Sequence, residues 1–260
     1  MPTTPTTTTI EISTKDGPCP TEVVTPEGAG PWPVVIELCD AAGLRPAQTR
    51  IAERLATLGY LVLQPDLFHR SPPLSSLSTL AEGGELTLAA IAKVFADPDQ
   101  RREFMQGWYL PALSYPNLTT TIGAVLQHIA KRTDVQGRVG ITGYCMGGNA
   151  AFRAATIFGD RIAATAAFHP GGLVTDQADS PHTRAAAITS RVYLGPAIGD
   201  LPPEAEATLR ATLDAGHVSY VIEHYDANHG YAVPDAPSYN EAAAERHYAA
   251  LAQLLRETLA

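Results

Sequence analysis

The stretch Gly143-Tyr144-Cys145-Met146-Gly147-Gly148 lies between a short β-rich run at 139–142 and a helical pattern at 147–158. A nucleophilic side chain flanked by glycines between a strand and a helix has the layout of a nucleophile elbow, here with cysteine where serine is commoner. The turn is so tight that the central residue takes a strained backbone conformation, and the flanking glycines prevent clashes with the strand and the helix. The sequence therefore predicts that Cys145 occupies such an elbow.

The Cys145 thiol has two interpretations. At the first turn of the following helix it would lie near unpaired backbone N–H groups and the positive end of the helix dipole, which favour a thiolate. The alternative is a buried, inert cysteine that packs as a small apolar residue, as most free cysteines do. The strand–turn–helix setting favours the reactive thiol.

Strand-like and helical patterns alternate on both sides of this elbow. The threonine-rich residues 1–8 are predicted to be a frayed tail, and a hairpin is predicted around Asp16-Gly17-Pro18. The further strand patterns lie at 34–38, 60–63, 163–168, 192–194 and 218–225, and the further helical patterns at 46–58, 118–132, 203–215 and 239–259. Such alternation predicts an α/β protein in three layers, a mainly parallel central sheet with helices on both faces.

The whole chain, residues 1–260, is predicted to form a single domain, because no shift of composition marks a linker. Between residues 71 and 115 the breakers Pro72-Pro73, Gly83-Gly84 and Asp97-Pro98 predict short helical pieces instead of one long element. We interpret this region as a cap-like excursion from the sheet.

Charge and composition exclude several classes of partner. The formal net charge is −9 and no cluster of Lys or Arg overrides it, so binding to nucleic acid or to an anionic membrane surface is not expected. No apolar run approaches the ~20 residues that span a bilayer, and the N-terminus has no basic start followed by an apolar segment. These features predict a cytoplasmic protein.

No metal or cofactor is predicted. The three cysteines, Cys19, Cys39 and Cys145, cannot all pair and lack the C-x-x-C spacing of zinc or redox sites, so they are expected to stay reduced. Neither G-x-G-x-x-G nor G-x-x-x-x-G-K-[ST] occurs, and a nucleotide-dependent oxidoreductase is therefore not indicated.

A cysteine nucleophile needs a base that takes its proton and returns it to the leaving group, and the pKa of histidine suits that task. His229 is the candidate, because it lies just after the strand predicted at 218–225. His128, His217 and His247 lie within or beside helical patterns, where exposed or capping roles are commoner.

Asp200 is the candidate for a third residue that orients the imidazole. It follows the strand pattern at 192–194 across a short loop, where such an acid is expected. The alternative role is an N-cap for the helix predicted at 203–215. The chain order Cys145, Asp200, His229 matches nucleophile, acid and base in α/β-hydrolases.

With these motifs the chain resembles the dienelactone hydrolase family of α/β-hydrolases. Besides the glycine-flanked cysteine, Gln64-Pro65-Asp66-Leu67-Phe68 is similar to the family's Pro-Asp-Leu-aromatic signature, and Asn228-His229-Gly230-Tyr231 to its His-Gly-aromatic segment. The resemblance covers nearly the whole chain after the N-terminal tail. It implies the α/β-hydrolase fold and a catalytic triad of Cys145, Asp200 and His229.

The resemblance also implies an oxyanion hole made by the backbone N–H groups of Met146 and Ala41. Ala41 follows Asp40, which aligns with an acid that contacts the resting thiol in the family. That acid is usually a glutamate, and Glu37 points the other way if its strand stays regular. Tyr144, beside the cysteine, is a further candidate for contact with the thiol or the substrate.

Other candidate contacts come from the excursion and from the strand after the elbow. Arg101 or Arg102 could bind an anionic substrate, although a solvated helix face is the commoner role for such a pair. Trp108 and Tyr109 are expected either to wall a pocket or to pack in the core. His169 follows the strand after the elbow helix and is expected to border the site.

These residues predict a carboxylesterase-type hydrolase that cleaves an ester or lactone through a thioester on Cys145. Well-known members of the family clamp a substrate carboxylate with an arginine after the histidine, and residues 230–235 contain none. The alternative is a non-hydrolytic protein that binds a small molecule or senses redox state through the same thiol. A monomer or small homo-oligomer acting on a small molecule is expected.

Overall fold

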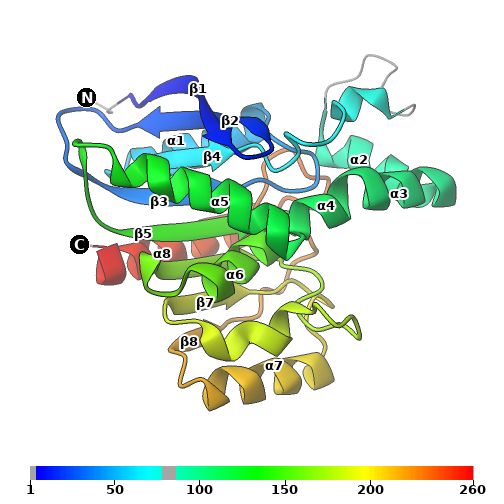
Figure 1. Cartoon of the computed structure of the whole chain (residues 1–260). Helices are drawn as coiled ribbons and strands as arrows, with labels where there is room; N and C mark the ends of the chain where they lie inside the picture. The colour runs from blue at the N-terminus through cyan, green and yellow to red at the C-terminus, as the bar shows by residue number, and fades with distance from the viewer. Residues whose placement is uncertain (1–3, 78–85, 260) are drawn as a thin grey trace.

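One sheet forms the centre of the described chain, which comprises residues 4–77 and 86–259 of the computed structural model (Figure 1). Its strands are β1 (Thr6–Thr14), β2 (Gly17–Thr25), β3 (Trp32–Leu38), β4 (Leu61–Pro65), β5 (Val135–Tyr144), β6 (Ile162–Phe168), β7 (Arg191–Gly195) and β8 (Tyr220–Ile222). They lie in the order β1-β2-β4-β3-β5-β6-β7-β8. β2 runs antiparallel to β1 and β4, and the other neighbours are parallel. The predicted hairpin and mainly parallel sheet are confirmed.

The central strand β3 is buried on both faces because its side chains alternate between two apolar layers. Val34 and Ile36 belong to the apolar cluster on one face, whereas Val35 belongs to the cluster on the other. Glu37 follows the same alternation and lies on the face of Val35, where Gln64 Nε2 donates to its Oε1 at 3.0 Å. As expected for a regular strand, Glu37 thus points away from the face that Val34 and Ile36 share.

Helices cover both faces of this sheet (Figure 1). α5 (Tyr115–Ala130) and α6 (Met146–Phe158) pack on the first face, and α1 (Pro46–Ala56) and α8 (Glu241–Leu259) on the second. α7 (Pro203–Ala215) packs against β7 and β8 at one end of the sheet. The predicted three-layer α/β architecture is confirmed. Within the described residues, no helix has both the length and the apolar character that crossing a bilayer requires.

The excursion predicted between residues 71 and 115 is a series of short helices at one end of the sheet, on the right in Figure 1. Thr87 and Asp97 begin two of them, because each side chain accepts hydrogen bonds from backbone N–H groups of the following turn. The predicted breaker Gly83-Gly84 lies outside the described residues. The helical pieces are η1 (Leu74–Ser76), α2 (Leu88–Ala96), α3 (Pro98–Phe104), the π-helical turn η2 (Met105–Tyr109) and α4 (Leu110–Leu113).

The prediction of a frayed tail over residues 1–8 is wrong for its last three positions. β1 begins at Thr6, and residues 6–8 pair with residues 23–25 of β2. Threonine is β-branched and suits an extended strand, so a run of threonines beside an available partner strand pairs with it. Residues 1–3 lie outside the described part of the chain.

The last strand is also shorter than predicted, since β8 covers only part of the pattern at 218–225. The Val218 N–H donates to the carbonyl oxygen of Leu213 at 3.0 Å, and the Tyr225 N–H donates to that of Pro196 at 2.9 Å. The first of these bonds belongs to the turn after α7, whereas the second ties the chain beyond β8 to the segment just after β7. The chain then continues into the loop that carries His229.

The close packing of α6 on the sheet depends on two glycines. A Cβ built on Gly147 would lie 2.1 Å from the carbonyl oxygen of Leu38, and one built on Gly143 would lie 2.2 Å from the carbonyl oxygen of Gly147. Only a hydrogen atom fits at either position, so these residues set how closely α6 approaches β3 and β5.

We predict that Gly147→Ala lowers the free energy of unfolding by about 3 kcal/mol, because backbone must move to admit the methyl group. Gly107→Ala is the matched control, since a Cβ there meets no atom within 4 Å. Urea unfolding followed by circular dichroism measures both variants. Equal, small effects in the two variants would show that α6 does not depend on this contact.

Candidate active site

Cys145 forms the turn between β5, which ends at Tyr144, and α6, which begins at Met146. Its φ of 53° and ψ of −117° lie in a region that residues other than glycine rarely adopt. The Cys145 N–H donates to the carbonyl oxygen of Phe168 at 3.0 Å and to His169 Nδ1 at 3.1 Å. The end of β6 therefore holds this strained turn, as the elbow pattern in the sequence leads us to expect.

The three thiols of the chain lie in different environments. Cys19 and Cys39 are fully buried, whereas Cys145 is partly exposed and borders a cavity. Burial raises the pKa of Cys19 to about 11 and raises that of Cys39 as well. Buried thiols of raised pKa are poor nucleophiles at neutral pH, so Cys145 is the thiol with access to a substrate.

His229 and Asp200 approach Cys145 from the loops that follow β8 and β7. His229 Nδ1 lies 2.7 Å from Asp200 Oδ1, and Asp200 Oδ2 accepts the Ala197 N–H at 3.0 Å. The His229 ring also interacts with the Cys145 side chain, and Ser238 Oγ donates to the His229 carbonyl oxygen at 2.5 Å. The structure thus brings together the three residues of the predicted triad.

The electrostatics of His229 favour its protonated form. Burial acts to lower the pKa of His229, but the hydrogen bonds and charge interactions with Asp200 and Cys145 outweigh burial and raise the pKa to about 10. At neutral pH the ring is therefore an imidazolium, with a proton on each nitrogen. An imidazolium beside a sulfur nucleophile can later donate this proton to a leaving group.

The two predicted oxyanion donors lie on either side of the elbow. Met146 is the first residue of α6, and an N–H in the first turn of a helix has no acceptor within that helix. Ala41 lines the same cavity as Cys145 and belongs to the turn after β3, in which the Gly43 N–H donates to the Asp40 carbonyl oxygen at 3.1 Å. A turn and a helix end thus flank the thiol.

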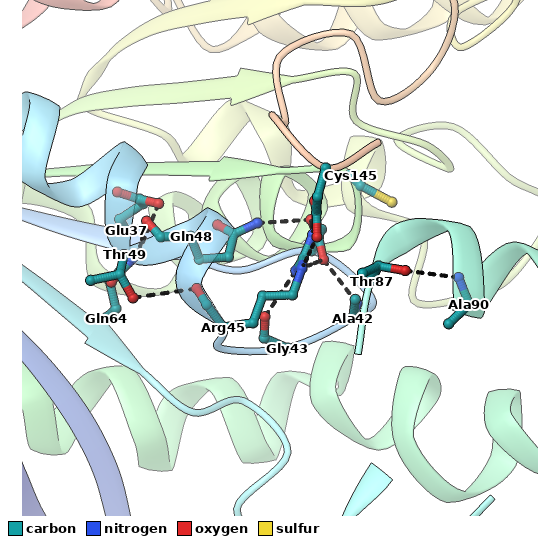
Figure 2. A network of polar contacts seen from close by, with 12 residues as sticks. Glu37, Ala42, Gly43, Arg45, Gln48, Thr49, Gln64, Thr87, Ala90 and Cys145 are labelled. Carbon is teal, nitrogen blue, oxygen red and sulfur yellow. Dashed lines mark hydrogen bonds and ion pairs between the residues drawn. The ribbon is translucent and has the colours of Figure 1, made fainter. Parts of the chain in front are cut away.

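A buried arginine, Arg45, joins this turn to the loop that carries His229. Figure 2 shows Arg45 beside Ala42 and Gly43 of the turn. Arg45 Nη1 and Nη2 donate to the two carboxylate oxygens of Asp40 at 2.7 and 2.9 Å. Arg45 Nε and Nη2 donate to the carboxylate of Asp235 at 2.7 and 2.8 Å, and Nη1 also donates to the Gly43 carbonyl oxygen at 3.0 Å. A guanidinium group has five N–H donors, and these contacts use all of them.

Both carboxylate oxygens of Asp40 accept hydrogen bonds within this network. Gln48 Nε2 donates to Oδ2 at 2.7 Å and the Ala42 N–H donates to Oδ1 at 2.8 Å, in addition to the bonds from Arg45. Burial raises the pKa of Asp40, and its hydrogen bonds and ion pair with Arg45 oppose that change. Figure 2 shows the Cys145 sulfur directed away from Arg45. Asp40 therefore organises the turn, a different role from the thiol contact that the resemblance implies.

A cavity of about 580 Å³ lies beside the elbow. Its volume falls within the range of small-molecule sites, roughly 300–1,000 Å³. The loops at the strand ends line one part of it and the excursion lines the other. The lining residues are Ala41, Leu88, Ile91, Ala92, Phe95, Met105, Tyr109, Cys145, Gly171, His229, Gly230, Ala236, Pro237 and Ser238.

The excursion supplies only some of the predicted contacts. Tyr109 lines the cavity, whereas Trp108 is buried in the core and its indole N–H donates to a backbone carbonyl oxygen at 2.8 Å. Arg101 and Arg102 are exposed on α3 and outside the cavity lining, and Arg102 pairs with Asp99 at 2.7 Å. Of the two roles that the sequence leaves open for these arginines, their positions on α3 fit the solvated helix face.

Tyr144 and His169, two other candidate contacts, lie beneath the elbow. Neither is among the described residues that line the cavity. Tyr144 is fully buried, and its hydroxyl lies 3.1 Å from Nε2 of His247. His247 is buried too, against the sequence interpretation, and burial lowers its pKa to about 3. His169 is fully buried, and burial and the neighbouring His229 lower its pKa. Tyr144 and His169 thus support the elbow from the core side.

Sequence reasoning missed Arg45, Gln48 and Asp235, although they fix the turn that carries Ala41. Arg45 and Asp235 are 190 positions apart, and no spacing rule connects them. One signal was present in the sequence. Asp235 is an acid in the segment where the family resemblance leads one to expect a cation, and its partly buried carboxylate pairs with a positive charge from elsewhere in the chain.

We predict that Arg45→Met lowers the free energy of unfolding by about 3 kcal/mol, because it leaves Asp40 buried without its counter-charge. Arg102→Met is the control, since the exposed Arg102–Asp99 pair is expected to contribute less than about 1 kcal/mol. Urea unfolding at neutral pH gives both values. Arg45→Met as stable as the control would contradict a structural role for the network.

Comparisons with known proteins agree with the observed fold. A model of the dienelactone hydrolase family matches residues 20–259 of the chain. A protein of Methylorubrum extorquens with the provisional name carboxymethylenebutenolidase is 26% identical over 141 residues, which are 54% of this chain and 40% of that protein. The chain therefore spans less than half the length of that relative.

Two further comparisons extend over most of the chain. An Escherichia coli O157:H7 protein with the same provisional name is 27% identical over 228 residues, 83% of this chain and 73% of that protein. A crystal structure from Klebsiella pneumoniae subsp. pneumoniae MGH 78578, provisionally a dienelactone hydrolase, superposes with a TM-score of 0.77 and 19% identity. That match covers 97% of this chain and 98% of the other, and it shows the same fold.

Proposed function

The chain belongs to the dienelactone hydrolase family, and we propose that it hydrolyses a carboxylic ester or lactone. In this proposal Cys145 is the nucleophile, His229 the acid and base, and Asp200 the group that orients His229. The observation that carries it is the meeting of these side chains from three separate loops beside one cavity. A small molecule that fits this cavity is the expected substrate.

The first half of the reaction transfers the acyl group to sulfur. The Cys145 thiolate, whose proton resides on His229, adds to the carbonyl carbon and forms a C–S bond. The carbonyl oxygen becomes an oxyanion, which the N–H groups of Met146 and Ala41 would bind, each contributing roughly 3 kcal/mol. The C–O bond to the alcohol then breaks, and His229 gives its proton to the leaving oxygen.

The second half releases the acid. Neutral His229 takes a proton from a water molecule, and the resulting hydroxide adds to the thioester carbonyl carbon. The C–S bond then breaks, the acid departs, and the thiolate of Cys145 and protonated His229 are restored. Esters and lactones suit this scheme because a thiolate expels an alkoxide or enolate far more readily than an amine.

We predict that Cys145→Ala and His229→Ala each lower kcat by at least about 10³-fold, because each removes a member of the triad. A panel of esters and lactones, dienelactones included, measured by product release gives the rates. Circular dichroism verifies that each variant is folded. Full activity in folded Cys145→Ala would refute the proposed nucleophile.

Cys19→Ala is the matched control, because it removes a buried thiol away from the cavity and should retain activity. A wild-type protein that binds members of the panel without cleaving them would favour a non-hydrolytic binding protein. Reversible oxidation of Cys145 without turnover of any ester would favour a redox sensor.

We predict a decline of kcat/KM as pH rises through about 10, because His229 loses the proton that the leaving group needs. The hydrogen bond that His229 donates to Asp200 contributes to the raised pKa of His229, so Asp200→Asn should shift this decline to lower pH. Rates corrected for spontaneous hydrolysis across neutral to alkaline pH test the shift. An unchanged position of the decline in Asp200→Asn would contradict the assigned pairing.

A further inference from the structure

We infer that the substrate is an uncharged ester or lactone with a hydrocarbon substituent that lies against the excursion wall of the cavity. This inference rests on the proposed function and names the substrate class of the same site. The excursion wall is defined as Leu88, Ile91, Ala92, Phe95, Met105 and Tyr109. It consists of apolar side chains and one phenol.

The side chains with which the excursion wall faces the cavity are mostly hydrocarbon. Leu88, Ile91, Ala92 and Phe95 recur at helical spacing on α2, so one helix face supplies four of the six residues of the wall. Met105 continues this surface from the π-helical turn, and its flexible thioether adapts to irregular shapes. On the opposite side Ala236 and Pro237 add further apolar surface.

No lysine or arginine of the described residues lines the cavity. The stretches of sequence outside them, residues 1–3, 78–85 and 260, contain neither residue type. Among the described side chains that line the cavity, only Cys145, His229 and Tyr109 can ionise, and the first two are assigned to the reaction. No cation therefore remains to pair with a charge on the substrate.

Two buried arginines of the described residues, Arg45 and Arg153, lie outside the cavity lining. Arg45 uses all five N–H groups on Asp40, Asp235 and the turn. Arg153 Nε donates to Asn149 Oδ1 at 2.9 Å, and its Nη1 donates to a backbone carbonyl oxygen at 2.9 Å. Binding a substrate carboxylate to Arg45 would require its network to break, and Arg153 is paired with Asp179, with 3.5 Å between Nη1 and Oδ2.

A carboxylate on the substrate would therefore be dehydrated without a counter-charge, and it would lie near the proposed thiolate. Both effects oppose binding of an anion, whereas a hydrocarbon chain gains from leaving water. The cavity thus selects by charge as well as by size. This specificity differs from recognition of a substrate through an arginine clamp.

The test compares two esters of equal carbon number, para-nitrophenyl hexanoate and the mono-para-nitrophenyl ester of adipic acid. They differ in a terminal methyl group against a terminal carboxylate. We expect kcat/KM for the adipate monoester to be at least about 30-fold lower. Along the series from acetate to hexanoate, we expect kcat/KM to rise roughly threefold to fourfold for each methylene that the wall buries.

A single substitution in the excursion wall should reverse the effect of charge. Ala92 is exposed at the cavity on α2, and both Arg and Gln are good helix formers there. Ala92→Arg should raise kcat/KM for the adipate monoester at least about tenfold relative to Ala92→Gln, because the cation pairs with the carboxylate. Ala92→Gln controls for added length without charge.

The outcomes separate this inference from the proposed function. Wild type that hydrolyses the adipate monoester as fast as the hexanoate would overturn the inference and leave the hydrolase intact. Equal rates for Ala92→Arg and Ala92→Gln on the adipate monoester would also overturn it, because the excursion wall would then not contact the acyl chain. Failure to hydrolyse any ester or lactone would overturn the proposed function itself.

Discussion

The position of Cys145 depends on one steric constraint, the close approach of α6 to the ends of β3 and β5. Gly143 and Gly147 permit this approach, because a Cβ on either would overlap a backbone carbonyl oxygen at 2.2 or 2.1 Å. The strained φ of Cys145 persists because the end of β6 accepts its N–H. The thiol is thus fixed before a substrate arrives, and groups fixed in advance need no reorganisation during the reaction.

The Arg45 network fixes the other side of the cavity by a charge constraint. Two carboxylates, Asp40 and Asp235, lie within hydrogen-bond distance of one guanidinium, and each belongs to a loop that borders the proposed site. Removing Arg45 would leave two acids of like charge near one another, one of them fully buried. The turn with Ala41 and the loop with His229 are therefore held by the same side chain. This use of arginine leaves the cavity itself without a cation.

Sequence reasoning succeeded where local rules apply. The glycine-flanked Cys145 and the loop positions of Asp200 and His229 could be predicted, because an elbow and the ends of successive strands follow from short-range patterns. It failed where contacts depend on the folded chain. Arg45 and Asp235 meet across 190 positions, and their pairing has no local signal. Likewise, the burial of Tyr144 at the end of β5 and of His169 just after β6 depends on how these strands pack in the folded chain, which residue type alone does not specify.

Acyl transfer to Cys145 is the step that distinguishes thiol catalysis from attack by activated water or from ligand binding alone. The most direct measurement is rapid acid quench of wild type with para-nitrophenyl hexanoate, followed by mass spectrometry of its peptides. We predict a hexanoyl group on the peptide that contains Cys145, removable by neutral hydroxylamine as expected for a thioester. Turnover with Cys145 unmodified throughout, or acylation of another residue in its place, would contradict the assignment of this thiol as the nucleophile.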